Sequence, residues 1–373
     1  MQDLRFGKPT ELFLEQSGVF LDKALETFGA SNLFSLQPII TRNSIPIPPV
    51  VIEDYHNIHS DKLQKLRESY FSEQGVAYFI VLNPETPTNF KHPLFEIANQ
   101  LVDDLELYYP IIHPLEGHPE AVTRFGQSDG TVKIYDLVKK QDGYREQAET
   151  SEMFSLHTDG LGSGGTVATT ALYMDAPQIV GGYTFFLNII RLALELARTD
   201  MEAFRALFLP DALTHFRPRG KGAIKVKSPV IFLNEKNNPQ SFFRTSSGEY
   251  IVEWRRDIPA LDRAMNFLNY YSQPFAPTSF FIHLTAKGHG CFIRNQVMAH
   301  GRTSFTDGPA ENQKRVLSRK WYMISERDTV YKHVPGMFIS KGYGDLFPDL
   351  FGAEFLQGEW QYNAELEKNI KLK

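Results

Sequence analysis

Short apolar runs, most of them bounded by turn-forming residues, recur along the chain and predict a mainly β protein. We expect strands at residues 76–82, 121–137, 153–158, 168–174, 213–217, 223–233, 250–254, 279–284, 291–298 and 315–324. Many short strands separated by turns favour a double-stranded β-helix, which is a jelly roll of the cupin type. The pattern therefore predicts a mainly β fold with α insertions.

Apolar residues at helical spacing predict helices that buttress or interrupt these strands. The first helix would be capped by Ser60 or Asp61, carry Leu63 and Leu66 on one face, and stop at Gly75. Further helices are expected at about 93–107, 185–209 and 259–271.

We predict that residues 1–373 form one domain with three parts. Residues 1–120 would be a buttress of helices and strands, and residues 121–324 the jelly-roll core, with a helical insertion near 185–209. Residues 325–373 would be a C-terminal extension of loops and a polar helix.

Two polar stretches are predicted to be loops. Residues 138–150 are charged and poor in apolar side chains, and they directly precede the strand at 153–158. This loop is either a solvated surface segment or a mobile lid over a site. Residues 234–249 are rich in Asn, Ser and Gly.

Composition narrows the classes of function. A net charge of −5 and a pI near 6.1 argue against a nucleic-acid-binding protein, which usually has a basic surface. The single cysteine, Cys291, cannot form an internal disulfide, so a reducing cytosol is the simplest location. The chain shows neither a signal peptide nor an apolar run long enough to span a membrane. We therefore expect a cytoplasmic protein with no membrane partner; its oligomeric state does not follow from the sequence.

The first candidate site is His157-Thr158-Asp159, at the end of the strand predicted for residues 153–158. Side chains alternate along a strand, so His157 and Asp159 point to the same face. Two histidines and one carboxylate on one face of a metal, with other positions open, are typical of Fe(II) oxygenases. His-x-Asp alone is weak, because it recurs by chance and a histidine at a strand end is often only hydrogen-bonded.

A third ligand is expected from a distant strand, and His300, which follows the apolar stretch from Cys291, is the best candidate. The competing histidines are less well placed. His283 lies in an apolar strand as a core residue and His289 lies in a predicted turn. Five more are upstream in helical or loop segments: His56, His59, His92, His113 and His118.

Arg315 and Arg319 lie four residues apart on the strand predicted for 315–324, so they share a face. An arginine fork binds a carboxylate through two parallel charge-assisted hydrogen bonds. The alternative is a solvated basic strand edge, since Lys314 and Lys320 are adjacent.

Taken together, these motifs resemble the taurine dioxygenase and clavaminate synthase superfamily of Fe(II)/2-oxoglutarate-dependent oxygenases. The shared pattern is His-x-Asp, Gly-Gly-x-Thr, His-Gly-Arg-x-x-Phe and Arg-x-x-x-Arg, in that order. Here the four motifs begin at His157, Gly181, His300 and Arg315, and they span about 150–323.

The resemblance implies a role for each matching residue. His157, Asp159 and His300 would bind iron, and Arg315 with the hydroxyl of Thr184 would bind the distal carboxylate of 2-oxoglutarate. Arg319 would meet the carboxylate of an amino-acid substrate. The implied reaction consumes O2, releases succinate and CO2, and oxidises an unactivated C–H bond of a small molecule.

The carboxylate at Asp159 favours hydroxylation, with desaturation or ring closure as variants, because related halogenases carry a small residue there. Two other functions remain open: a cupin-like metal-dependent isomerase or lyase, and a non-catalytic binding protein on the same barrel. Three acidic residues would grip a cationic side chain or simply be surface: Glu235, Glu249 and Glu253.

Overall fold

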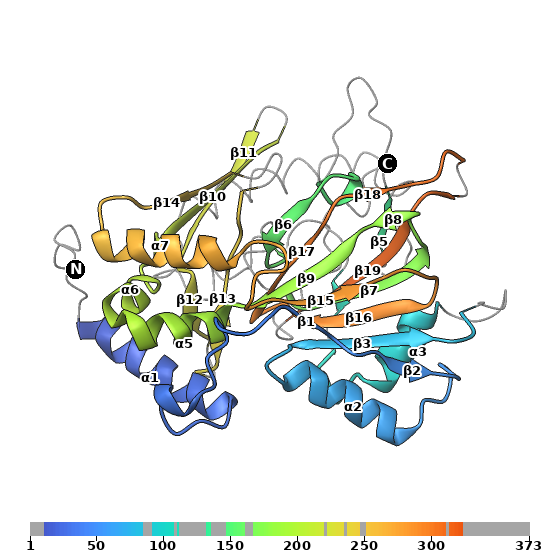
Figure 1. The fold of residues 1–373 in the computed structure, drawn as a ribbon, viewed down its shortest axis with the longest axis horizontal. Coiled ribbons are helices and arrows are strands. Elements are labelled where there is room, and N and C mark those ends of the chain that lie inside the picture. The colour runs from blue at the N-terminus through green and yellow to red at the C-terminus, as the bar shows by residue number, and fades with distance from the viewer. Residues whose placement is uncertain are drawn as a thin grey trace, which may run out of the picture.

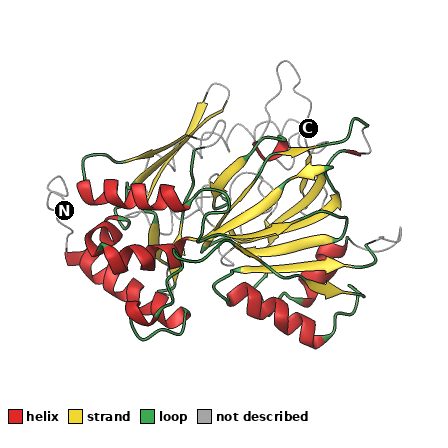
Figure 2. Ribbon diagram, in the orientation of Figure 1, coloured by secondary structure: helices red, strands yellow, loops and turns green. Residues whose placement is uncertain are grey.

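Two β-sheets, with helices packed around them, form most of the computed structural model (Figures 1 and 2). The structure describes residues 11–84, 92–107, 110–111, 132–135, 147–160, 167–219, 222–234, 237–246, 251–310 and 313–323. Within these ranges the chain is mainly β with helical insertions, as the sequence predicted.

The first sheet has five strands in the order β1-β15-β9-β17-β6. Their bounds are Ile45–Pro46, Phe280–His283, Tyr183–Asn188, Met298–Arg302 and Phe154–His157, respectively. All neighbours are antiparallel except β1 and β15. The pairing of β17 with β6 places His300 directly opposite His157.

The second sheet has seven strands, in the order β2-β3-β16-β7-β19-β4 with β5 also paired to β19. The bounds are Val50–Ile52, Val76–Val81, His289–Arg294, Val167–Ala176, Val316–Met323, Pro110–Ile111 and Val132–Tyr135, respectively. Helices α2 (Ser60–Phe71) and α3 (Pro93–Gln100) pack on one face of this sheet, where Leu66 and Ile97 join a cluster with Phe79 and Phe292.

The largest apolar cluster joins the other face of this sheet to the five-stranded sheet. Leu172 and Ile293 from the seven-stranded sheet are buried with Phe186 and Ile282 from the five-stranded one. Burying an apolar side chain of this size stabilises the fold by about 1.5–3 kcal/mol relative to leaving it exposed to water. The core thus fixes the separation of the two sheets, and the metal-ligand candidates lie between them.

A helical unit extends from one end of the sheets (Figure 1). It contains α1 (Glu11–Thr27), α5 (Ile189–Thr199), α6 (Met201–Ala206) and α7 (Pro259–Tyr271). The associated strands are β10 (Leu213–Arg219), β11 (Gly222–Ser228), β14 (Ile251–Trp254), β12 (Ile231–Leu233) and β13 (Pro239–Ser241).

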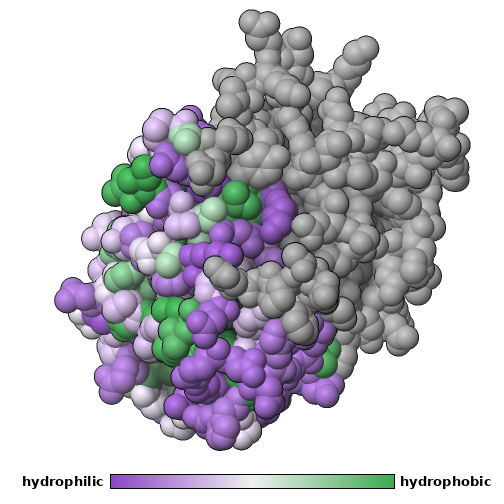
Figure 3. All heavy atoms as spheres, turned by 90° about the vertical axis from the view of Figure 1, so that its right-hand side faces the viewer, coloured by the Kyte–Doolittle hydropathy of each residue, from purple (hydrophilic) through white to green (hydrophobic). Residues whose placement is uncertain are grey.

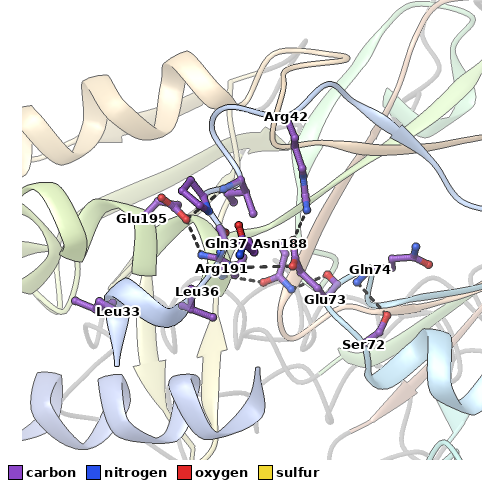
Figure 4. A network of polar contacts seen from close by, with 12 residues as sticks. Leu33, Leu36, Gln37, Arg42, Ser72, Glu73, Gln74, Asn188, Arg191 and Glu195 are labelled. Carbon is purple, nitrogen blue, oxygen red and sulfur yellow. Dashed lines mark hydrogen bonds and ion pairs between the residues drawn. The ribbon is translucent and has the colours of Figure 1, made fainter. Parts of the chain in front are cut away.

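A buried polar network attaches α5 to the rest of the molecule (Figure 4). The Arg191 guanidinium donates to the Glu195 carboxylate at 2.8 Å and also to the Gln37 carbonyl. The Asn188 side chain caps α5 by accepting from Arg191 N, and it donates to the Glu73 carbonyl at 2.9 Å. Arg42 forms an ion pair with Glu73, and Arg198 forms one with Glu195. We call these four residues and Arg191 the α5 network.

Several predicted boundaries are wrong, for local reasons. Helix α2 begins at Ser60 with His59 as its N-cap, and no side chain caps it, so neither Ser60 nor Asp61 is the cap. It ends at Phe71, and Gly75 (φ 59°) lies in the turn that follows. Helix α3 ends at Gln100 and gives way to turns, although the helical spacing continued to 107.

The insertion also begins later than predicted. Residues 185–188 complete strand β9, because their backbones pair with β15 on one side and β17 on the other. The predicted loop 234–249 contains strand β13, and His289 opens strand β16 instead of lying in a turn.

Some predictions fall outside the described residues. These include most of 121–137, the stretch 138–146 of the suggested lid, the extension beyond Met323, and Glu235 and Glu249. The rest of the suggested lid begins with a short 3-10 turn, Gln147–Glu149, in which both end residues are buried.

Among the described residues, no helix is long and apolar enough to cross a membrane. On the face shown in Figure 3, the apolar residues of the described surface form small groups separated by hydrophilic ones.

Candidate metal and cosubstrate site

The three predicted metal ligands come together at the end of β6. One ligand atom from each of His157, Asp159 and His300 lies within 4.8 Å of the other two, and all three residues are buried. Nε2 of His157 is 3.5 Å from Oδ1 of Asp159, and Nε2 of His300 is 3.5 Å from Oδ2. This set could hold a metal ion with two imidazoles and one carboxylate.

Hydrogen bonds fix the orientation of these ligands. Nδ1 of His157 donates to the Ser155 carbonyl at 2.9 Å, which leaves Nε2 facing the centre of the site. Oδ2 of Asp159 accepts from the Thr170 hydroxyl at 2.6 Å and from Nε1 of Trp321 at 2.9 Å. Both donors come from the seven-stranded sheet, so Asp159 links the two sheets.

Asn295 holds the backbone of the carboxylate ligand. Its side-chain oxygen accepts from Asp159 N at 2.7 Å, and its amide nitrogen donates to the carbonyls of Asp159 and Val167. Sequence reasoning missed this residue and Trp321. Trp321 could have been found, because it shares a strand face with Arg319 at a spacing of two.

The charge state of the site suits a divalent cation. Burial raises the pKa of the Asp159 carboxyl, but His300, His157 and Arg319 outweigh burial and hold it well below its ordinary value. Burial is also the main cause that lowers the pKa of His157, and it lowers that of His300 to about 3. At neutral pH the site therefore presents two neutral imidazoles and one carboxylate, the forms that bind metal.

A pocket of about 60 Å³ opens beside these ligands, and all six candidate residues line it. Arg315 directly precedes β19 and is 3% exposed, whereas Arg319 within the strand is half-buried. Strand β19 lies between β7 and the pair β4 and β5, so it is not a sheet edge. The alternative of a solvated basic edge is therefore wrong for Arg315.

A second buried arginine, Arg302, lines the same pocket and had no predicted role. It donates to the carbonyls of Thr150 (2.8 Å) and Glu152 (2.7 Å). Among the described residues, Nη1 of Arg302 and Nε of Arg315 have no hydrogen-bond partner. A buried guanidinium with an unused donor favours an anionic ligand.

Burial lowers the pKa of both guanidiniums, and that of Arg315 falls to about 10 while nearby Asp307 raises it. Arg315 therefore stays charged at neutral pH. Among the described residues, the pocket carries three arginines with only Asp159 and Asp307 as acidic neighbours, so it has an excess of positive charge, which a bound divalent metal would increase and a dicarboxylate would reduce.

The Gly-Gly-Tyr-Thr motif positions Thr184 by its backbone. Gly181 (φ 79°) and Gly182 (φ 75°) adopt the left-handed conformation, and a Cβ at Gly181 would lie 2.3 Å from the Ser304 carbonyl. The chain then enters β9, where buried Thr184 pairs with Arg302 of β17 and lines the pocket.

The guanidinium carbon of Arg319 lies 4.1 Å from the centre of the Trp321 ring. This stacking holds Arg319 along the wall of the pocket, next to the tryptophan that supports Asp159. Three of the competing histidines have partners elsewhere: His283 with the Gly181 carbonyl, His289 with Tyr78 and His92 with Asp175.

Comparisons with known proteins match most of the chain. The family model described as taurine catabolism dioxygenase TauD, TfdA family, matches residues 44–321. A uridine-5′-phosphate dioxygenase from Streptomyces sp is 32% identical over 272 residues, which are 70% of this chain and 90% of that protein. One from Amycolatopsis sp is 24% identical over 215 residues, 57% of this chain and 76% of that protein.

Among solved structures, the non-heme iron oxygenase OrfP, in complex with Fe and alpha-ketoglutaric acid, has a similar fold. The TM-score is 0.50 at 14% sequence identity, and the match covers 76% of this chain and 85% of OrfP.

Proposed function

Because the chain belongs to the TauD/TfdA family of dioxygenases, we propose that it oxidises uridine 5′-phosphate or a closely related pyrimidine nucleotide. The observation that carries this substrate is the 32% identity to a uridine-5′-phosphate dioxygenase over nine-tenths of that protein. The reaction at the substrate would be hydroxylation of an unactivated C–H bond, which the retained Asp159 favours.

The class of enzyme is a Fe(II)/2-oxoglutarate-dependent dioxygenase, as the resemblance predicted. Its cofactor is Fe(II), and its cosubstrates are 2-oxoglutarate and O2; together they supply an oxidant while 2-oxoglutarate becomes succinate and CO2. A dioxygenase is neither a cupin-like isomerase or lyase nor a non-catalytic binding protein, so those alternatives are set aside.

His157, Asp159 and His300 would bind the iron, in the protonation states that their burial and mutual charge favour. Arg315 and Thr184 would bind the distal carboxylate of 2-oxoglutarate, supported by their burial in the lining of the same pocket. Ionic and hydrogen-bonded contacts of this kind orient the cosubstrate and exclude water from the reacting atoms.

Arg319 would bind the anionic group of the substrate. For a nucleotide this group is a phosphate, instead of the amino-acid carboxylate that the sequence suggested. A free amino acid is the second candidate, and only the position of Arg319 beside the metal ligands favours it. We also propose that the two facing sheets are the walls of a jelly roll within one domain.

The test is succinate formation by the purified protein with Fe(II), 2-oxoglutarate and O2. Uridine 5′-phosphate should stimulate succinate well above the rate without substrate, in step with its own consumption, and His157→Ala should abolish the stimulation. If the nucleotide has no effect while one member of an amino-acid panel stimulates succinate, the nucleotide proposal is wrong and the second candidate replaces it.

A further inference from the structure

A buried arginine outside the predicted motifs lies next to the metal ligands. Residues 242–246 run beside β6, where Thr245 N donates to the Leu156 carbonyl at 2.8 Å and Arg244 is paired with His157 in an antiparallel bridge. Residues directly opposite each other in an antiparallel pair send their side chains to the same face. Arg244 therefore projects on the face that carries the metal-ligand candidate His157.

The surroundings of Arg244 confirm this direction. Its guanidinium carbon lies 5.8 Å from the centre of the Phe154 ring, which stacks on His157 at 4.0 Å. Burial is the main cause of the low pKa of His157 and His300, and the positive charge of Arg244 lowers both further. The side chain is 6% exposed, so its charge acts with little screening by water.

Arg244 also lines a second, larger pocket of about 530 Å³. The pocket lies against β14 and α7, and its wall includes Trp254, Asn269 and Ser246. This volume is within the range of small-molecule binding sites. The wall includes an indole ring, amide and hydroxyl groups and a buried guanidinium, which complement a nucleobase, a sugar and a phosphate, respectively. It also carries one acidic and one further basic side chain, Glu253 and Arg256.

We propose that this second pocket binds the nucleoside part of the substrate, with the pyrimidine stacked on Trp254 and the phosphate held by Arg244 beside the metal ligands. The inference rests on the proposed function, because it assumes a nucleotide substrate. An arginine fork matches a phosphate in charge and geometry, and an aromatic face stacks on any base.

Arg244 and Arg319 would then approach one phosphate from two sides. Arg244 comes from the segment beside β6, and Arg319 comes from β19 in the other sheet. Arg319 lines the pocket with His157 and His300, and Arg244 lies opposite His157, so both arginines are next to the same metal-ligand candidates. A phosphate monoester carries about −1.5 to −2 charges at pH 7, which two guanidiniums balance.

The test compares a nucleotide with its own fragments, using the anaerobic enzyme loaded with Fe(II) and 2-oxoglutarate. Titration calorimetry would measure the Kd of uridine 5′-phosphate, uridine and ribose 5-phosphate. Arg244→Gln should raise the Kd of the nucleotide by about 100-fold and change that of uridine by less than about 3-fold. Arg244→Lys keeps the positive charge but not the forked guanidinium, so its Kd for uridine 5′-phosphate should lie between those of the wild type and Arg244→Gln.

Trp254→Ala should weaken uridine and uridine 5′-phosphate alike, by about 10–100-fold, and leave ribose 5-phosphate unchanged. Trp254→Phe should restore most of the binding. The controls are Tyr270→Ala and Arg263→Gln, an exposed aromatic residue and an exposed arginine on α7, and neither should change any Kd. Comparing fragments within one variant separates lost contacts from damaged folding, which weakens all three ligands together.

Two failures are distinguishable. If the wild-type enzyme binds no uridine 5′-phosphate, the proposed function and this inference both fall. If the wild type binds it but Arg244→Gln weakens uridine as much as the nucleotide, or Trp254→Ala changes nothing, only the second-pocket inference is wrong.

Discussion

Buried or partly buried arginines gather in two regions of the protein, and the carboxylates beside them differ. In the α5 network, Arg191 pairs with Glu195 and Arg42 pairs with Glu73, each at 2.8 Å (Figure 4). In the pocket, Arg302 and Arg315 share one neighbouring carboxylate, Asp307, and among the described residues neither guanidinium has a carboxylate of its own as Arg191 and Arg42 do.

The difference separates a structural role from a binding role. A buried ion pair whose members come from the protein itself holds elements together, and removing one partner is costly because the other charge stays buried. Buried cations in excess over carboxylates cost stability in the ligand-free protein and are explained by an anion that binds later. The α5 network should therefore control stability, and the pocket arginines should control ligand affinity.

The largest effect is expected at the metal site. Asp159→Ala removes the only carboxylate ligand of the set, so metal affinity should fall by at least about 1,000-fold and turnover should be lost. Titration with Fe(II) under argon checks this. Metal binding that stays within tenfold of wild type would remove Asp159 from the ligand set.

Arg191→Gln should lower the free energy of unfolding by up to about 3–5 kcal/mol, because Glu195 would stay buried with only the longer ion pair to Arg198, at 3.4 Å, to balance its charge. The affinity for 2-oxoglutarate should stay within about threefold of wild type. Urea unfolding and calorimetry measure the two quantities. The double variant Arg191→Met with Glu195→Leu should recover most of the stability, and a loss equal to that of the single variant would argue against an ion-pair cause.

Arg315→Gln should show the opposite pattern. The Kd of 2-oxoglutarate should rise by about 100-fold, since two charge-assisted hydrogen bonds are lost. The unfolding free energy of the apoprotein should change by less than about 1 kcal/mol, because the side chain that is removed is a buried cation with an unused donor. A large loss of stability with unchanged 2-oxoglutarate binding would place Arg315 with the structural arginines.

The smallest effect is expected from Thr184→Val, which removes one hydroxyl from the pocket wall. The Kd of 2-oxoglutarate should rise by about tenfold, as for one hydrogen bond to a charged group, with metal affinity unchanged. The matched variant Thr170→Val removes a hydroxyl that supports Asp159. It should instead weaken the metal by about 10–100-fold. If the two variants changed the affinity for 2-oxoglutarate and the affinity for the metal equally, Thr184 and Thr170 would not have the separate roles proposed for them.

The sequence predicts best where a single local rule decides the outcome. Helix α7 has the predicted bounds of 259–271, and the side chains of His157 and Asp159 meet as predicted, although β6 ends at His157 and Asp159 lies just beyond it. The sequence predicts poorly where pairing with a distant segment decides whether a stretch forms a helix or a strand. The sequence predicts a helix over residues 185–188, because a short apolar run does not distinguish a helix from a strand that is paired on both sides.

Arg244 shows the same limit within the site. Its segment is polar by composition and was predicted to be a loop, but Phe243 and Arg244 are buried because the chain returns to pair with β6. No periodicity within 234–249 encodes that contact. The order of motifs indicated the metal and the cosubstrate, whereas the residues proposed to read the substrate come together only in three dimensions.

The most direct test of the account is an anaerobic titration with 2-oxoglutarate of the Fe(II)-loaded protein, observed through the visible charge-transfer band of the iron chelate. The account predicts a saturable band in the wild type, an equal band at the same concentrations in Arg191→Gln, and a band in Arg315→Gln only at about 100-fold more 2-oxoglutarate. Equal titrations of the wild type and Arg315→Gln would contradict the assignment of the pocket arginines to the ligand.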